Sequence, residues 1–281
     1  MSENSKIRIL GVELDNIGID EAASKFVSVL KGDDQHYAVT PNSEILLKSL
    51  EDSEYRDILN KAFLKVPDGA GQMWASSYLV DTANKGWIFR IFYFFWSAFF
   101  FPWNAKRRKT VIPERVTGVD LMEKVCSLSG VERFSVFLLG AAEGVAEIAA
   151  ENLENKYPGS FFVGTYSGGP AVEDEDKIVS LINIVQPQVL FVAFGAPWQE
   201  SWIARNLAKM PSVKMAMGVG GSFDFLAGYK RRAPNFMRVI GLEWLYRLFK
   251  EPGRFGRIWN AVVVFPFTIL MRRDENVEKD F

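Results

Sequence analysis

Apolar positions recur with two different periods along most of this chain. Short runs that are continuous or alternating in apolar residues predict strands at 6–14, 37–40, 134–139, 161–165, 189–194 and 213–219. Between them, apolar residues at every third or fourth position predict helices, among them 21–30, 44–52, 144–157 and 200–210. Because strands that are apolar on both faces alternate with helices, we predict an α/β fold with a Rossmann-like parallel sheet and flanking helices.

The pattern changes near residue 231, where the chain becomes helical and basic. We therefore predict two parts, an α/β core at 1–230 and a helical C-terminal appendage at 231–281. Basic helices with apolar faces are typical of segments that dock onto a protein body or a membrane surface. Either contact would suit this appendage.

A strongly aromatic segment interrupts the α/β core. Residues 87–103 carry one charge, at Arg90, and the basic run 106–109 (KRRK) follows. The segment reaches the lower limit of the length that crosses a bilayer core of roughly 30 Å, and aromatic rings with a basic flank also suit the headgroup region. We expect 87–109 to be a membrane-interacting insertion lying in the interface, because one folded core needs the chain on both sides of it. The alternative is a buried helical hairpin or a subunit interface.

Composition narrows the classes of partner and site. Lys and Arg total 33 against 34 Asp and Glu, and this balance gives no general reason to expect binding to nucleic acid. A single cysteine, Cys126, and a single histidine, His36, argue against a disulfide or a metal site built on these residue types. The first ten residues lack the apolar run of a signal peptide. We expect a location at the cytoplasmic face of the membrane, with a homo-oligomer as one alternative for the assembly state.

Glycine-rich loops follow several predicted strands. They are Gly140–Gly144 (GAAEG), Gly195–Glu200 (GAPWQE) and Gly218–Asp224 (GVGGSFD). Because strand ends of a parallel sheet meet at one edge, these glycines are candidates to approach a phosphate next to a helix N-terminus. None of the loops is a GxGxxG or Walker sequence, and tight turns also need glycine for packing.

Polar residues also follow the short strands of the first half. Thr40 and Asn42 lie at the end of the predicted strand 37–40, and Asp68 follows a second short strand that ends with Lys65 and Val66, so the three side chains could meet in one crevice. An aspartate placed there could take a proton from an attacking hydroxyl. The alternative is that Asn42 caps a helix and Asp68 forms a turn. Spacing alone favours that alternative.

Several motifs together resemble those of the WecG/TagA/CpsF glycosyltransferases, glycosyltransferase family 26. They are Thr40–Glu44 (TPNSE), Pro67–Gly69 (PDG), Gly195–Glu200 (GAPWQE), Gly220–Gly228 (GGSFDFLAG), Arg232–Pro234 (RAP) and Gly241–Arg247 (GLEWLYR). They occur in the family's order, and the resemblance spans residues 7–257. It implies inverting transfer of an N-acetylmannosamine-type sugar from UDP to a polyprenyl-diphosphate-linked N-acetylglucosamine, in teichoic acid or other cell-surface polysaccharide synthesis.

The resemblance also implies roles for individual residues. The expected catalytic residues are Asp68, Thr40, Asn42, Gln199, Arg247, Arg254 and Arg257. The expected donor-binding residues are Gly140, Gly195, Gln199, Gly220, Gly221 and Asp224. Asp68 would be the general base and Asp224 would help to hold the uridine. Guanidinium groups of the appendage would stabilise the charge that develops on the departing diphosphate.

The resemblance implies no metal and no cofactor beyond the UDP-sugar substrate. The acidic run 174–176 has the form DxD, but it begins a predicted helix, where acids are stabilised by the helix dipole. Two features depart from the family pattern. Residues 168–170 (GGP) replace a turn that carries an aromatic residue in many members, and compact members lack the insertion 87–109.

Two other functions stay open. A non-catalytic nucleotide-sugar-binding scaffold would keep the glycine-rich loops but has no need of Asp68 and its neighbours. A nicotinamide-dependent sugar oxidoreductase would use the α/β fold, but the sequence lacks the GxGxxG fingerprint in a strand–helix–strand unit. The transferase is the leading hypothesis.

Overall fold

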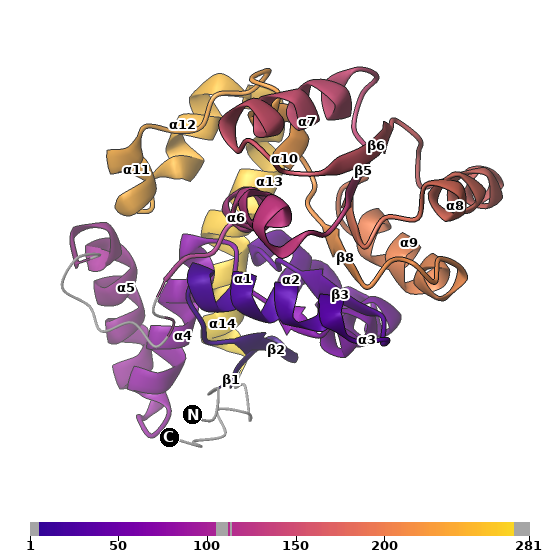
Figure 1. The fold of residues 1–281 in the computed structure, drawn as a ribbon. Helices are drawn as coiled ribbons and strands as arrows, with labels where there is room; N and C mark the ends of the chain where they lie inside the picture. Colours follow the sequence, from indigo (N-terminus) through magenta and orange to yellow (C-terminus); the bar gives the residue numbers. More distant parts are fainter. Residues whose placement is uncertain (1–5, 105–111, 113, 273–281) are drawn as a thin grey trace.

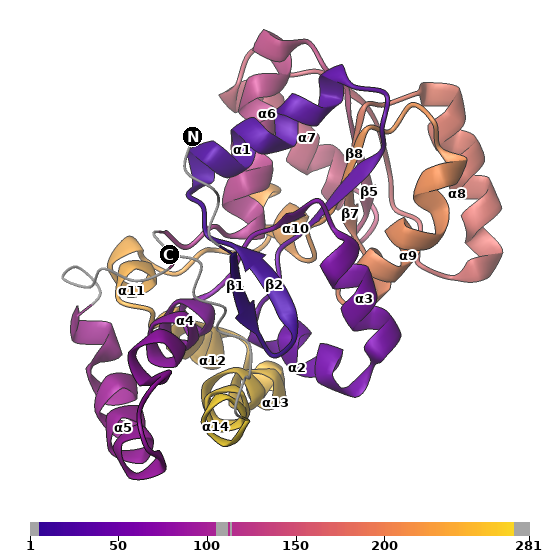
Figure 2. The ribbon, with the colours of Figure 1, turned by 90° about the horizontal axis from the view of Figure 1, so that it is seen from below.

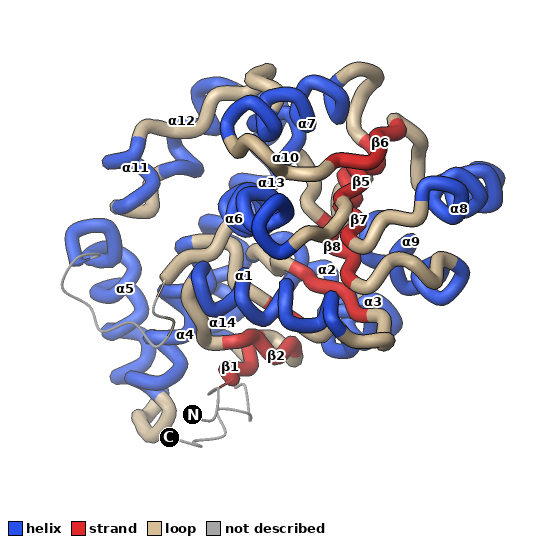
Figure 3. Tube along the Cα trace, viewed as in Figure 1, coloured by secondary structure: helices blue, strands red, loops and turns tan. Residues whose placement is uncertain are grey.

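The computed structural model describes residues 6–104, 112 and 114–272 of the chain. At its centre is one parallel sheet of six strands (Figure 1; red in Figure 3). In spatial order they are β4 (Leu64–Lys65), β3 (His36–Val39), β8 (Met215–Gly218), β7 (Val189–Ala193), β5 (Val136–Gly140) and β6 (Phe162–Tyr166). The predicted fold class, a helix-flanked parallel sheet, is confirmed.

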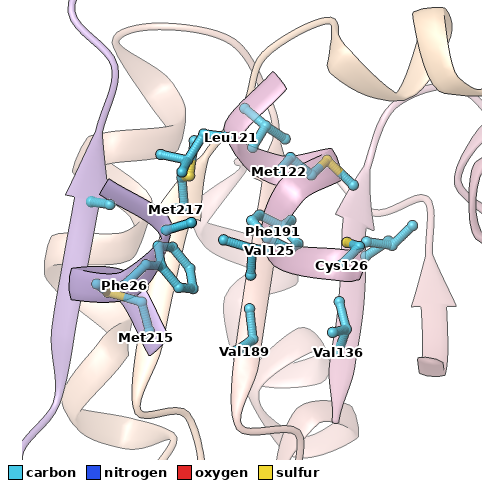
Figure 4. Close-up of a cluster of buried hydrophobic side chains, with 14 of the residues drawn as sticks. Phe26, Leu121, Met122, Val125, Cys126, Val136, Val189, Phe191, Met215 and Met217 are labelled. Carbon is cyan, nitrogen blue, oxygen red and sulfur yellow. The ribbon is translucent and has the colours of Figure 1, made fainter. Parts of the chain in front are cut away.

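Helices cover both faces of the sheet because successive strand residues point to opposite sides. One face carries α1 (Ile19–Ser28), α6 (Gly118–Glu132), α7 (Val145–Lys156) and α10 (Ser222–Leu226), and the other α8 (Val172–Val185) and α9 (Trp198–Asn206) (Figure 2). Short 3-10 turns extend α1 and α9 at Val29–Lys31 and Leu207–Lys209. Val136 of β5 is buried toward the first face and Phe137 toward the second. On the first face Phe26 stacks on Phe191 with ring centroids 6.0 Å apart (Figure 4).

The chain begins with a hairpin outside the main sheet. Residues 6–14 are predicted as one strand, but they form antiparallel β1 (Lys6–Ile9) and β2 (Val12–Asp15). That prediction is wrong because Leu10 and Gly11 both have positive φ, 52° and 81°, and reverse the chain in a two-residue turn. Leucine rarely adopts this conformation, so the sequence carried no ordinary turn signal.

A separate hydrophobic cluster, the hairpin cluster, connects β1 and β2 to several helices. These are α2 (Ser43–Glu51), α3 (Ser53–Lys61), α4 (Ala70–Thr82), α5 (Trp87–Asn104) and α14 (Phe265–Met271). Phe94 of α5 and Phe265 of α14 are both buried in it. Segments far apart in the sequence therefore share one core beside β3.

The appendage consists of short helical segments that run back across the α/β core. They are α11 (Asn235–Val239), α12 (Glu243–Lys250), a 3-10 turn (Pro252–Arg254), α13 (Phe255–Trp259), a π-helical turn (Asn260–Val264) and α14. Phe265, Ile269 and Leu270 are buried in the hairpin cluster, so the appendage docks onto the body. The division at residue 230 stays a prediction, and residues 273–281 of the appendage lie outside the described part of the chain.

Helix α5 has two different faces. Arg90, Phe94 and Ser97 are buried against the protein, whereas Phe92 and Phe99 are 73% and 66% exposed. Within the described ranges, which include α5, no helix has both the length and the apolarity needed to cross a membrane. The basic run 106–109 of the predicted insertion lies outside these ranges.

Candidate active site

A cavity of about 260 Å³ opens at the carboxyl ends of β3 and β4. Its walls are the loops that follow these strands, the segment that leads into α6, and the appendage from α12 to the π-helical turn. Among the described residues, its charged lining consists of Arg115, Arg232, Arg247, Arg254, Arg257, Glu44, Asp68 and Glu243. We call it the arginine cavity. Its position at strand ends is where ligands bind in open parallel sheets.

Asp68 lies in the wall of this cavity, in the loop after β4. Its backbone N–H donates to the Pro41 carbonyl at 3.0 Å, and its carboxylate accepts a long contact of 3.4 Å from the Gly118 N–H. Burial raises the pKa of the carboxyl group, and Arg115 and Arg247 only partly oppose this shift. A carboxylate with a raised pKa is a stronger proton acceptor than one in water. Asp68 can therefore accept a proton from a group bound in the cavity.

Asn42 both caps α2 and lines the arginine cavity. Its side-chain oxygen accepts the N–H groups of Glu44 and Ile45, each at 3.0 Å. The helix-cap interpretation is therefore correct, and the same residue also borders the cavity. Thr40 is buried behind the wall, where a Cβ placed on Gly118 would lie 3.2 Å from its hydroxyl oxygen.

The arginines predicted from the appendage reach the cavity. Arg247, Arg254 and Arg257 all line it. Arg257 donates to Glu44 of α2 at 2.7 Å, and Arg254 pairs with Glu251 at 2.6 Å. The appendage thus brings cations to the same space as Asp68, although these arginines follow that residue by more than 170 positions.

Sequence reasoning missed four charged residues of the cavity, Glu44, Arg115, Arg232 and Glu243. Arg115 and Glu243 form an ion pair at 2.9 Å, and Arg232 pairs with Asp120 at the start of α6. Burial raises the pKa of Glu243, but Arg247 and Arg115 outweigh this effect and hold it below the usual value. Arg232 and Glu243 belong to the motifs RAP and GLEWLYR, and this membership was the feature of the sequence that could have identified them as site residues. Arg115 stood in no motif that we singled out.

Gln199 lies elsewhere and ties two glycine loops together. Its side-chain oxygen accepts the N–H groups of Gly195 at 3.1 Å and Gly220 at 2.8 Å, and its amide donates to Glu200 at 2.8 Å. Gln199 is buried and does not line the arginine cavity. Its local role is to hold the loops after β7 and β8 in register.

The other predicted donor-binding residues also lie outside the arginine cavity. At Gly140 a Cβ would come within 2.9 Å of the Phe194 ring, so close packing alone requires glycine there. Asp224 of α10 pairs with Lys230 and lies near Gly221. These residues occupy the carboxyl end of the sheet, and their role in donor binding stays a prediction.

The acidic run 174–176 is part of α8. Glu175 is buried and pairs with Arg205 at 2.6 Å and, more distantly, with Lys209 at 3.9 Å. In the part of the chain that the structure describes, no group of three or more His, Cys, Asp or Glu side chains is arranged to hold a metal ion.

The comparison with known proteins agrees with the motifs. The family model described as "Glycosyl transferase WecG/TagA/CpsF family" matches residues 7–88 and 99–278, which leaves residues 89–98 of α5 outside the match. Relatives from Staphylococcus aureus strains MRSA252, MW2 and NCTC 8325 are named N-acetylglucosaminyldiphosphoundecaprenol N-acetyl-beta-D-mannosaminyltransferase. Each is 30% identical over 270 residues, which cover 95% of this chain and 93% of the relative. Because the match includes both the α/β core and the appendage, the chain belongs to the WecG/TagA/CpsF family of glycosyltransferases.

Proposed function

We propose that the chain transfers an N-acetylmannosamine-type sugar from UDP to a polyprenyl-diphosphate-linked N-acetylglucosamine, with inversion at the anomeric carbon. The observation that carries the proposal is the placement of Asp68 in a cavity lined by arginines of both the core and the appendage. The names of the Staphylococcus aureus relatives support the sugar and the acceptor. The resemblance to the family supports a role in teichoic acid or other cell-surface polysaccharide synthesis.

In this mechanism Asp68 takes the proton of the acceptor hydroxyl. The hydroxyl oxygen attacks the anomeric carbon from the side opposite the UDP, and the bond from that carbon to the diphosphate oxygen breaks. The electron pair of the broken bond leaves with UDP as negative charge. Arg247, Arg254 and Arg257 stabilise that charge, because guanidinium groups bind phosphate oxygens in a bidentate manner.

The donor's nucleotide lies at the strand-end loops next to the cavity. Gly140, Gly195, Gly220 and Gly221 let the backbone approach it, Gln199 holds two of these loops, and Asp224 contacts the uridine. In this proposal arginines, not a metal ion, neutralise the diphosphate. No further cofactor takes part.

The acceptor is a membrane lipid, and we place the protein at the cytoplasmic face as a peripheral protein. Helix α5 and residues 255–271 contain no acidic residue, and both expose aromatic rings. Phe267 of α14 lies 5.3 Å from Phe94 of α5, between ring centroids, so the two elements are neighbours. Exposed aromatic side chains on segments that carry no acidic residue of their own suit the headgroup region of an anionic membrane.

The test of the transferase uses purified full-length protein in liposomes with a series of UDP-sugars and a synthetic lipid-diphosphate-N-acetylglucosamine. We expect a disaccharide product of inverted configuration, also in the presence of a chelator. Asp68→Asn should lower kcat by about 100-fold or more, as expected for loss of a general base. Asp176→Asn, an exposed acid of the run 174–176, is the matched control and should keep full activity.

Three results would contradict this proposal: no product with any donor, undiminished turnover by Asp68→Asn, or loss of turnover on chelation. Binding of UDP-sugar without any transfer would instead favour the non-catalytic scaffold.

A further inference from the structure

We infer that Glu243 is a positioning residue that holds Arg115 of the α/β core and Arg247 of the appendage in the places from which they bind a diphosphate. The inference rests on the proposed function for its kinetic readouts. Its binding readout needs only a nucleoside diphosphate.

Glu243 is shared by two arginines from distant parts of the chain. One carboxylate oxygen accepts from Arg115 at 2.9 Å and the other from Arg247 at 2.5 Å. The side chains of Glu243 and Arg115 are only 13% and 17% exposed, whereas Arg247 is 38% exposed and also packs on the Phe225 ring. A charge-assisted bridge this shielded from water fixes both guanidinium groups more firmly than a surface pair would.

The local structure explains why a glutamate stands here. Glu243 is the first residue of α12 and Arg247 lies one turn later, so the helix places the two side chains on the same face. Arg115 arrives from the segment before α6, 128 positions earlier in the chain. Two guanidinium groups near one point repel each other, and a carboxylate between them removes that repulsion.

The ion pairs of Glu243 with Arg115 and Arg247 lie next to the proposed base. The carboxyl group of Asp68 is near Arg115, Arg247, Glu243 and the Gly118 N–H, and its charge also helps to raise the pKa of Arg232. Arg115 and Arg247 lower the pKa of Asp68, while Glu243 raises it. Removing the charge of Glu243 takes away its own smaller effect, but it also lets Arg115 and Arg247, whose effects are larger, move away from Asp68. The pKa of Asp68 should therefore rise, and the acid limb of the pH–rate profile should move to higher pH.

A competing explanation makes the opposite prediction for binding. If Glu243 merely occupied the arginines in the absence of substrate, its removal would free two cations and tighten diphosphate binding. If it positions them, its removal weakens binding in spite of the gain in positive charge. Measured affinity thus separates the two explanations.

The experiment compares Glu243→Gln and Glu243→Asp with the wild-type chain, using UDP and inorganic pyrophosphate as probes in titration calorimetry. For Glu243→Gln we expect the UDP dissociation constant to rise and kcat/KM to fall, each by about tenfold or more, as for the loss of a charge-assisted hydrogen bond. We also expect the acid limb of kcat/KM to move to higher pH, because the two arginines no longer stay beside Asp68. Glu243→Asp keeps the charge with a shorter reach, so its acid limb and its UDP affinity should both lie between those of the wild type and Glu243→Gln.

The matched control is Glu175→Gln. Glu175 is also a shielded carboxylate shared by two cations, Arg205 and Lys209, but it lies on α8 away from the cavity. It should lose thermal stability without any change in UDP affinity or in the pH profile. Thermal unfolding of every variant identifies a protein that has not folded.

The outcomes separate the inference from the proposed function. Unchanged or tighter UDP binding by a folded Glu243→Gln protein overturns the inference, even if the wild type transfers sugar normally. Absence of UDP and pyrophosphate binding by the wild type overturns it as well. Weakened binding in Glu243→Gln without sugar transfer by the wild type leaves the inference standing and overturns the proposed transferase.

Discussion

The oxygen of the Asn42 side chain binds two backbone N–H groups at the start of α2, and the residue also borders the arginine cavity. These two roles can be separated by substitution. Asn42→Ala removes the cap and should lower the free energy of unfolding by about 1 kcal/mol. Asn42→Asp keeps a capping oxygen, so stability should be retained, but it adds a negative charge beside the diphosphate site and should weaken UDP binding. Urea unfolding and UDP titration measure the two effects.

Equal losses of stability in Asn42→Ala and Asn42→Asp would contradict the capping role. If Asn42→Asp binds UDP as tightly as the wild type, Asn42 does not lie at the diphosphate site, and its capping role is unaffected.

Single residues were predictable where a motif or a strand end marked them. Asp68, Asn42 and Arg247 stand in such motifs, Arg254 and Arg257 are implied by the family resemblance, and the structure brings all five to one cavity. Arg115 escaped because its ion pair joins residues 128 positions apart, which no local pattern encodes, and Glu243 stood inside the motif GLEWLYR without being given a role. The family resemblance implies that Gln199 lies in the same pocket. Its side-chain oxygen instead accepts hydrogen bonds from Gly195 and Gly220 in the strand-end loops, outside the arginine cavity.

Helices and strands could be predicted from the period of the apolar residues where the packing of the element is regular. The central strands β5, β7 and β8 are buried on both faces, and their continuous apolar runs predicted them. The hairpin at the start was read as one strand because its turn uses Leu10 with positive φ, stabilised by burial in the hairpin cluster rather than by a turn sequence. Helix α5 was recognised as aromatic, but its division into a buried and an exposed face needed the fold.

That division leads to a prediction for membrane binding. Phe92, Trp96 and Phe99 follow one another at helical spacing and are 73%, 61% and 66% exposed. Replacing all three by serine should leave the fold intact and weaken binding to anionic phosphatidylglycerol vesicles by about tenfold or more, because ring burial in the interface is lost. Vesicle sedimentation measures binding, and thermal unfolding reports on the fold.

The control replaces similarly exposed apolar residues of α6 and α8 by serine, namely Val131, Val172 and Ile184, which are 78%, 68% and 80% exposed. Vesicle binding should be unchanged in this control. Equal loss in both triple variants would indicate a general effect of surface polarity, and no loss in the α5 variant would contradict membrane contact through this helix. Substituting exposed positions is sharper than deleting 87–103, since deletion would also remove buried Phe94 from the hairpin cluster.

At the scale of the whole molecule, the appendage is joined to the body by both apolar packing and charge. Phe265 enters the hairpin cluster, while Arg232 and Arg257 pair with Asp120 and Glu44 of the α/β core. Composition indicated a segment different from the core, but it could not show that this segment contributes to the core's own packing. The arginine cavity exists only while the appendage is docked, because its wall from α12 to the π-helical turn belongs to the appendage.

A pair of phenylalanines in α14 tests this dependence of the site on docking. Phe265 is fully buried, whereas Phe267 is 46% exposed, two residues further along the same helix. Phe265→Ala should lower the free energy of unfolding by about 3–5 kcal/mol, the usual cost of emptying a large core site, and should loosen the appendage. Loosening withdraws Arg247, Arg254 and Arg257 from Asp68, so UDP binding should weaken although no cavity residue has changed.

Phe267→Ala, the control, should alter the free energy of unfolding by less than about 1 kcal/mol and retain UDP binding. Urea unfolding, limited proteolysis of the appendage and UDP titration distinguish the two variants. Phe265→Ala could lose stability and yet, fully folded in the absence of denaturant, bind UDP as tightly as the wild type. In that case the cavity does not depend on this docking contact, and the arginines reach the diphosphate by another route.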